Sequence, residues 1–334
     1  MKFGAVPVAA AAGCLLAHGL KQGAVVFRKG RLLSAADVFA LQAEGVDEVI
    51  VAQLDGDDVP EDVAAQALAD ALCGAGAHST KANTGRANLL ADAHGLAVVD
   101  AGRIHAINAV HESLTVATVP PFEPIASGQM LATIKIIPYA VPRAALQQAL
   151  ALAQGATSAL GVAAFVPRRV ALAMTRLADT RAAVLAKMRE AVAKRLQPLS
   201  SPLQCEAVVQ HDVQALASVL RAWADADAAD VLLISGIAAT VDRADVVPAA
   251  IEAAGGTVLH AGMPVDPGNL LVLGTLHGKP VVGLPTCARS PKLNGFDFVL
   301  RRLVAGLPVD AAQIMQMGVG GLLTEIPTRP MPRG

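Results

Sequence analysis

The sequence has few aromatic residues and few charges. Only 3% of its 334 residues are aromatic and 16% are charged, whereas 54% are hydrophobic. Its 27 basic and 28 acidic residues leave a net charge of −1, so no excess of basic residues is available to neutralise the phosphates of a nucleic acid. Aromatic rings that could stack on bases are scarce as well. We therefore expect no nucleic-acid partner.

Long apolar runs and paired cysteines are also missing. The mean hydropathy is +0.49, but alanine, valine and leucine supply most of it, and no stretch approaches the roughly 18 consecutive apolar residues of a membrane-spanning helix. The four cysteines are scattered and form no Cys-x-x-Cys pair, which argues against a zinc knuckle or a disulfide framework. We expect a cytoplasmic protein without a membrane segment, and so apolar a chain predicts a homo-oligomer such as a dimer.

The first 18 residues have the outline of an export signal. Lys2 precedes an apolar run at residues 5–16, and the Ala-Ala-Gly-Cys sequence at residues 11–14 is similar to a lipoprotein cleavage site. The run is short and mostly alanine, only one basic residue precedes it, and residues 15–18 continue the pattern of an amphipathic helix. We therefore expect a helix here and not a signal peptide.

The length predicts two or three domains, and the residue pattern divides the chain into four parts. Residues 1–78 are predicted to form an α+β region with a helix capped by Ser34. Residues 79–155 favour strands separated by proline and glycine, which indicates a small β-rich module. In residues 156–310 strands and helices alternate, which predicts a three-layer α/β/α domain with a mainly parallel sheet. Residues 311–334, rich in glycine and proline, are expected to form a tail that resists packing. The fold class is α/β.

Three segments of the predicted α/β/α domain follow strands at the edge where open parallel sheets bind ligands. Glycine lets a ligand approach the backbone, helix amides bind anions, carboxylates bind metal ions, and arginine suits a phosphate. Together these segments predict a phosphate-bearing ligand. The candidate residues are Ser235, Gly236, Thr240, Asp242 and Asp245 in the first segment, Asp266, Pro267 and Gly268 in the second, and Pro285, Thr286, Cys287, Arg289, Ser290 and Lys292 in the third.

Some of these residues have a simpler interpretation. Asp245 precedes a helix, and its position is equally consistent with stabilising the helix dipole and with binding a metal ion. Cys287 has no base near it in the sequence, so a catalytic thiol is the less favoured interpretation. We expect His260 and His277 at a strand edge or in a loop and not as metal ligands.

Motifs in these segments carry a resemblance to a known family. Ser-Gly with small residues follows the central strand, Gly-Met-Pro-Val-Asp-Pro-Gly-Asn stands at residues 262–269, and Gly-Lys-Pro-Val-Val-Gly-Leu-Pro stands at residues 278–285. With them, residues 157–306 resemble the molybdopterin-binding domain of molybdenum cofactor biosynthesis proteins, which molybdopterin adenylyltransferases and molybdopterin molybdotransferases share. Residues 13–54 more weakly resemble the N-terminal part of the molybdotransferases.

The resemblance implies a ligand and a reaction. Loops at residues 235–242 and 285–292 would hold the pterin and its phosphate. Two acidic residues, matched by Asp212 and Asp245, would position Mg²⁺ for the insertion of molybdate into molybdopterin. Residues 318–330 resemble the join to a nucleotidyltransferase domain whose glycine-rich signature these 334 residues lack, so that partner is expected on another chain or beyond these residues.

The sequence departs from the family pattern at four positions. Ile237 replaces the second glycine of the first motif, Ala239 replaces a serine, and Thr286 and Cys287 replace a glycine and an asparagine. A Cβ atom at position 237 blocks close approach to the backbone. Three functions stay open. The first is an enzyme similar to molybdopterin molybdotransferases, the second a non-catalytic module that binds molybdopterin or its adenylylated form for a nucleotidyltransferase, and the third an unrelated sugar-phosphate or nucleotide enzyme on the same fold.

Overall fold

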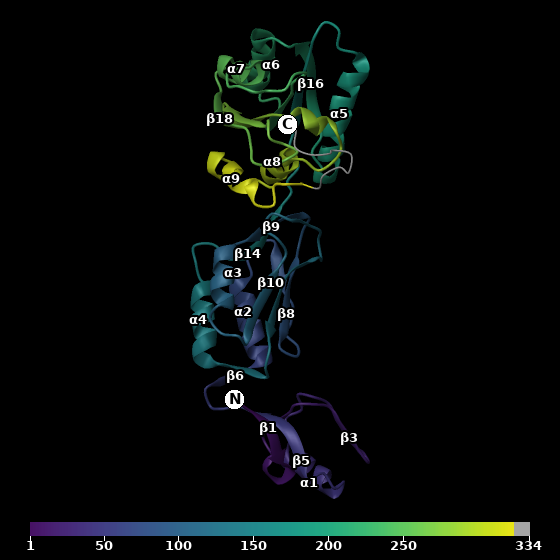
Figure 1. Cartoon of the computed structure of the whole chain (residues 1–334), viewed down its shortest axis with the longest axis vertical. Helices are drawn as coiled ribbons and strands as arrows, with labels where there is room; N and C mark the ends of the chain where they lie inside the picture. The colour runs from purple at the N-terminus through teal and green to yellow at the C-terminus, as the bar shows by residue number, and fades with distance from the viewer. Residues whose placement is uncertain (324–334) are drawn as a thin grey trace, which may run out of the picture. The chain divides into compact units, whose positions relative to one another are not determined.

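A computed structural model describes residues 1–323 and shows a mixed α/β protein of two compact units (Figure 1). The first unit is Met1–Ala164, and the second begins at Phe165. Residues 160–164 belong to the first unit because the strand β14 (Leu160–Ala164) pairs antiparallel with β9 (Gly95–Val99). No helix within residues 1–323 is both long enough and apolar enough to cross a membrane.

The N-terminal part of the first unit is a small three-stranded sheet, and this corrects the helix expected at residues 15–18. Residues 15–16 form a short strand that pairs with the same strand as residues 2–7, which places the apolar run in a sheet. A φ of +82° at Gly13 allows the chain to turn just before it. The elements are β1 (Lys2–Pro7), η1 (Val8–Ala10), β2 (Leu15–Leu16), β3 (Leu20–Gln22), β4 (Val25–Phe27), α1 (Ala35–Ala43) and β5 (Glu48–Gln53), and the sheet order is β1-β5-β2.

The start of α1 confirms the predicted cap. The Ser34 side chain accepts from the Asp37 amide, and the Asp37 carboxylate accepts from the Ser34 amide. The same carboxylate pairs with Arg31 at 2.7 Å. These hydrogen bonds, that from Arg31 foremost, lower the pKa of Asp37 to about 2.

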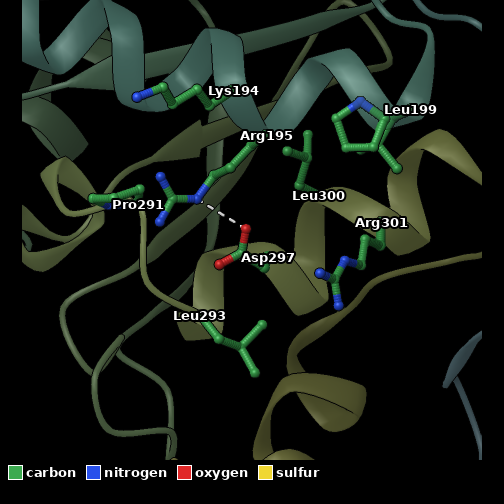
Figure 2. A pocket seen from close by; sticks show the side chains of 9 residues that line it. Lys194, Arg195, Leu199, Pro291, Leu293, Asp297, Leu300 and Arg301 are labelled. Carbon is green, nitrogen blue, oxygen red and sulfur yellow. Dashed lines mark hydrogen bonds and ion pairs between the residues drawn. The ribbon is translucent and has the colours of Figure 1, made fainter. Parts of the chain in front are cut away.

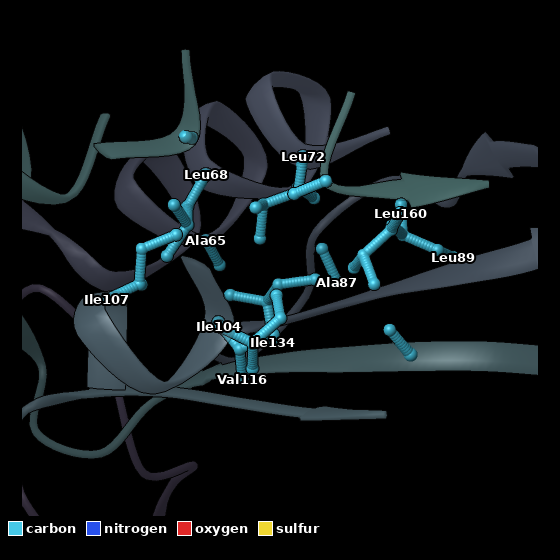
Figure 3. Packing of buried hydrophobic residues seen from close by; sticks show 14 of the residues in the cluster. Ala65, Leu68, Leu72, Ala87, Leu89, Ile104, Ile107, Val116, Ile134 and Leu160 are labelled. Atoms are coloured by element: carbon cyan, nitrogen blue, oxygen red, sulfur yellow. The ribbon is translucent and has the colours of Figure 1, made fainter. Parts of the chain in front are cut away.

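The rest of the first unit surrounds a single apolar core (Figure 3). Leu68 and Leu72 of α2 pack with Leu89 and Ile134 of the sheet beneath, all without exposed surface. This core draws on both predicted N-terminal parts, because α2 precedes residue 79 and the sheet follows it. The elements are β6 (Asp58–Pro60), α2 (Glu61–Leu72), β7 (Ala77–Ser79), β8 (Arg86–Ala91), β9, α3 (Ala101–Asn108), β10 (Leu114–Thr118), β11 (Pro124–Ile125), β12 (Met130–Ile136), β13 (Ala140–Pro142), α4 (Arg143–Ala153) and β14.

The second unit confirms the predicted three layers around a mainly parallel sheet. Its strand order is β16-β15-β17-β20-β19-β18. Alternate residues of β15 face two separate cores, one beneath α5 and α8 and the other beneath α6 and α7 (Figure 1). The elements are β15 (Val170–Arg176), α5 (Ala182–Leu196), η2 (Gln197–Leu199), β16 (Leu203–Gln210), α6 (Val213–Asp225), β17 (Val231–Ser235), α7 (Val246–Ala253), β18 (Thr257–Ala261), β19 (Val272–Leu276), β20 (Lys279–Gly283), η3 (Thr286–Arg289) and α8 (Gly295–Val304).

One strand of this sheet runs against the others. β19 pairs antiparallel with both β18 and β20. Only His277 and Gly278 join β19 to β20, and both have positive φ, of 50° and 76°, as a tight hairpin turn requires. A parallel connection needs a dozen residues or more. The carboxyl ends of β15, β16, β17, β18 and β20 therefore share one edge of the sheet.

Residues 311–323 pack on the second unit, which corrects the expectation of an unpacked tail there. Asp310 and Gln313 form a capping box at the start of α9 (Ala311–Met315), and η4 (Gln316–Gly318) follows. The apolar side chains of Ile314 and Met317 are buried in the core beneath α5 and α8. Burial of these two side chains outweighs the local glycine content. The predicted proline-rich part, at residues 327–332, lies outside the described residues.

Candidate functional site

The first candidate segment follows β17 at the carboxyl edge of the sheet. Ser235 ends the strand and is buried, as is Gly236. The Ile237 side chain packs against the core beneath α5 and α8, and its backbone amide donates to the Thr175 hydroxyl of β15 at 2.8 Å. The exposed loop that follows leaves the amides of residues 238–240 without a described hydrogen-bond partner. Three consecutive free amides can bind an anion.

Arg289 connects the third segment to the first. Its Nη2 atom donates to the carbonyl oxygens of Gly236 and Ile237, each at 2.7 Å. Its Nε atom is buried and has no described partner. Burial lowers the pKa of Arg289, and no described carboxylate opposes this shift. A half-buried guanidinium therefore stands at the strand ends without a described counter-ion.

The two acidic residues of the first loop serve the loop itself. Asp245 Oδ2 accepts from the amides of Val241, at 2.7 Å, and Asp242, at 3.2 Å. Asp242 Oδ1 accepts from the Ala244 amide at 2.7 Å. The carboxylates thus close the turn before α7, and the Asp245 side chain makes no capping hydrogen bond to that helix.

Asp212 caps α6. Its Oδ1 atom accepts from the amides of Gln214 and Ala215, both at 3.0 Å. Within residues 1–323 there is no group of three or more His, Cys, Asp or Glu side chains that could hold a metal ion.

The second segment lies against the start of α8. Asp266 and Pro267 are joined by a cis peptide bond, and the Pro267 carbonyl accepts from the Gly295 amide at 2.8 Å. Gly268 has a φ of +145°, and a Cβ atom there would stand 2.7 Å from the Gly295 nitrogen. Only glycine fits this backbone contact between the second and third segments.

Arg195 lies beside the third segment and fixes its conformation through hydrogen bonds (Figure 2). This buried guanidinium donates to the carbonyl oxygens of Ala288, Ser290 and Lys292 at 2.7–3.0 Å, and its Nε atom donates to Asp297 at 2.8 Å. Burial raises the pKa of Asp297, although the charge of Arg195 opposes the shift. The pair lines a cavity of about 240 Å³ whose other walls include Leu293, Leu300 and Arg301.

The remaining residues of the third segment have separate positions. Pro285 is buried and precedes η3, which contains Thr286 and Cys287. The buried Asn294 amide donates from Nδ2 to the Cys287 sulfur at 3.1 Å. The side chains of Ser290 and Lys292 are exposed. The structure therefore joins Gly236, Ile237 and Arg289 directly, whereas Asp212 serves its own helix and Pro267 and Gly268 lie at α8.

Sequence reasoning missed two residues of this edge. Thr175 is the next-to-last residue of β15 and has no exposed surface, and its hydroxyl lies 2.9 Å from Nδ1 of His211, which follows β16. A hydroxyl at the end of a buried strand was the available signal for Thr175. Nothing in the sequence links it to His211, which is 36 residues away.

Comparisons with known proteins add little to this geometry. Residues 5–53 match a family described as a domain of unknown function (DUF8806), and no curated protein matches the sequence. Among solved structures the chain is similar to a molybdopterin biosynthesis MoeA protein from Pyrococcus horikosii, with 17% identity, coverage of 74% of this chain and 79% of that chain, and a TM-score of 0.32.

Two further structures are similar to smaller shares of the chain. A molybdenum cofactor biosynthesis protein B has 16% identity, coverage of 43% of this chain and 96% of that chain, and a TM-score of 0.32. The protein CinA, of unknown function, from Thermoplasma acidophilum has 14% identity, coverage of 37% and 90%, and a TM-score of 0.27. Similarities of this size decide neither the family nor the activity of the chain, and the fold described above rests on the chain's own structure.

Proposed function

We propose that the second unit binds molybdopterin, or its adenylylated form, at the carboxyl edge of its sheet and acts in molybdenum cofactor biosynthesis. Support comes from the sequence motifs at residues 235–242, 262–269 and 278–285. It also comes from the site, because Arg289 of the third candidate segment donates to the carbonyl oxygens of Gly236 and Ile237 in the first.

Arg289 is the observation that carries the proposal. Arg289 is half-buried, so its charge is partly removed from water while part of the guanidinium stays open to a ligand. The described residues supply two carbonyl oxygens to Nη2 and leave Nε without a partner. A phosphate provides both the missing charge and additional acceptor oxygens. The free amides of residues 238–240 lie in the loop that Arg289 holds, so they can bind the same anion.

Within residues 1–323 neither Asp212 nor Asp245 belongs to a group of three or more His, Cys, Asp or Glu side chains that could hold a magnesium ion. Asp212 Oδ1 is engaged by two amides of α6, and Asp245 Oδ2 is engaged by two amides of its own loop. Metal insertion through a magnesium ion held by these two residues is therefore not part of the proposal. The capping role of Asp212 and the loop-closing role of Asp245 favour the non-catalytic module, which would serve a nucleotidyltransferase on another polypeptide or beyond these residues.

Titration of the purified chain with molybdopterin, followed by the fluorescence of the pterin, tests the proposal. Arg289→Ala should weaken binding by about 10- to 100-fold, since a hydrogen bond to a charged group contributes about 1.5–3 kcal/mol. Arg221→Ala is a matched control, because Arg221 also donates to a backbone carbonyl but lies on α6. Equal affinities for the two variants would exclude Arg289 from the site, and failure of the wild-type chain to bind would reject the proposal.

A second measurement separates the module from the enzyme. The wild-type chain is incubated with molybdopterin, molybdate and Mg²⁺, and the product is analysed for inserted molybdenum. A binding module retains molybdopterin without conversion. Turnover that Asp245→Asn abolishes would instead establish the transferase. Preference for an unrelated nucleotide or sugar phosphate over molybdopterin would point to the third function.

A further inference from the structure

A buried hydroxyl ties three strand ends together beside the candidate site. Thr175 is the next-to-last residue of β15 and has no exposed surface. Its Oγ1 atom lies 2.8 Å from the Ile237 nitrogen, just after β17, and 2.9 Å from Nδ1 of His211, just after β16. The hydroxyl therefore determines how both neighbours are presented at this edge.

The hydrogens of this arrangement can be assigned from donor and acceptor capacity. The Ile237 amide can only donate, so Thr175 Oγ1 accepts there. The single hydroxyl hydrogen of Thr175 then has one described acceptor, which is Nδ1 of His211. Because buried polar hydrogens are nearly always hydrogen-bonded, Nδ1 accepts, and the neutral ring carries its own hydrogen on Nε2.

The imidazole of His211 is connected to the candidate site through Thr175. His211 is half-buried, and its Nε2 atom has no described hydrogen-bond partner. The peptide group between Gly236 and Ile237 separates it from Arg289, since its N–H donates to Thr175 and its carbonyl oxygen accepts from Arg289. A donor on His211 and a cation on Arg289 therefore flank one peptide unit.

We infer that His211 is a ligand-binding residue that donates its Nε2 hydrogen to an oxygen atom of the anionic ligand, and that Thr175 is the residue that positions it. The inference rests on the proposed anion site and adds a second side chain to it. Arg289 supplies charge, whereas His211 supplies a directional neutral donor. Loss of Arg289 or of His211 therefore weakens binding. Thr175 acts indirectly, because it controls the tautomer of His211.

The tautomer can be measured on the ligand-free chain. In protein with ¹⁵N-labelled histidine, long-range proton–nitrogen correlation spectra distinguish the two ring nitrogens, and the spectrum of His211→Gln assigns the signal. We expect hydrogen on Nε2 in the wild-type chain, a mixture of tautomers in Thr175→Val, and the wild-type tautomer in Thr175→Ser. A hydrogen on Nδ1 in the wild-type chain would overturn the inference. A merely structural Thr175 would leave the tautomer unchanged in Thr175→Val.

Binding of inorganic phosphate, measured by calorimetry, tests the contact with the ligand. Glutamine can place an amide donor near the position of Nε2, whereas asparagine is too short. His211→Asn should therefore weaken binding about ten-fold, and His211→Gln by less than about three-fold. His277→Gln is the matched control, because His277 lies in the β19–β20 turn at the opposite edge.

The outcomes also separate this inference from the proposed function. Binding that requires Arg289 but is unaffected by His211→Asn would overturn the inference and leave the anion site in place. A wild-type chain that does not bind phosphate would overturn both the anion site and the role of His211.

Discussion

The two units of the molecule differ in where they place polar side chains. In the first unit the buried polar residues are Asp37, which caps α1, and Ser113. In the second unit they are Thr175, Arg195, Ser201, Ser235, Asn294 and Asp297. Most of these lie at strand ends or hold the loops that follow strands. Buried polar groups fix conformations that apolar packing alone leaves free, so their concentration indicates which unit positions a ligand.

Each unit also contains a buried polar atom without a described hydrogen-bond partner, and these two atoms support the same contrast between the units. Asn88 Oδ1 in the first unit and Arg289 Nε in the second are buried without a described partner. Asn88 is neutral, and an unmade hydrogen bond to an amide oxygen costs little in comparison with a buried charge. Of these two atoms, only that of Arg289 belongs to a cation, which a ligand could compensate.

The largest expected effect comes from the ion pair that holds the third segment. Arg195→Met leaves the Asp297 carboxylate buried without its partner, so the free energy of unfolding of the second unit should fall by about 3–5 kcal/mol. Urea unfolding monitored by Trp223, the only tryptophan and part of α6, measures it. Arg189→Met, which breaks the more exposed pair with Glu206, should cost about 0–1 kcal/mol. Similar losses in both variants would contradict the special role of Arg195.

A core substitution in the first unit sharpens the contrast. Leu68 is fully buried beside Leu72, and Leu68→Ala should destabilise the first unit by about 2–4 kcal/mol through lost packing. Hydrogen exchange should therefore accelerate in α2 and β8, whereas the unfolding transition of Trp223 should not move. An equal shift of the Trp223 transition would show that the two units unfold together.

The smallest effect is expected at the cap of α1, and it depends on pH. Because the pKa of Asp37 is lowered from 3.8 to about 2, its stabilising contribution is present above about pH 4 and is lost as the pH falls towards 2. Asp37→Asn should cost about 1 kcal/mol at pH 7 and little at pH 2, as measured by hydrogen exchange of residues 35–43. Asp57→Asn, at an exposed position, serves as the control. A cost of the same size at both pH values would show that the Asp37 charge is not what stabilises the cap.

Local patterns were sufficient to predict most elements of the second unit. The alternation of apolar strands and amphipathic helices predicted its three layers. The antiparallel β19 was missed although a signal existed, because the six residues between the apolar stretches at residues 270–273 and 280–284 are too few for a parallel crossover. At residues 15–18 an apolar pattern was mistaken for a helix because the pairing strand, β5, lies more than 30 residues later.

The candidate site was only partly predictable for a related reason. Arg289 and the loop at residues 235–242 stood out because residue type and position after a strand suffice to suggest an anion site. The contacts made by Arg195 join residues about 100 positions apart, and the hydrogen bond between Thr175 and His211 joins residues 36 apart. Such contacts depend on tertiary packing, which a motif does not encode.

The position of β16 at the end of the second unit's sheet has a consequence for association between molecules. Among residues 1–323 its eight residues, Leu203–Gln210, pair with β15 on one side only, so their outer backbone groups are available to a strand from another molecule. Glu206 lies in the middle of this strand and forms an ion pair with Arg189. Charged side chains at this position thus disfavour aggregation through the edge of the sheet.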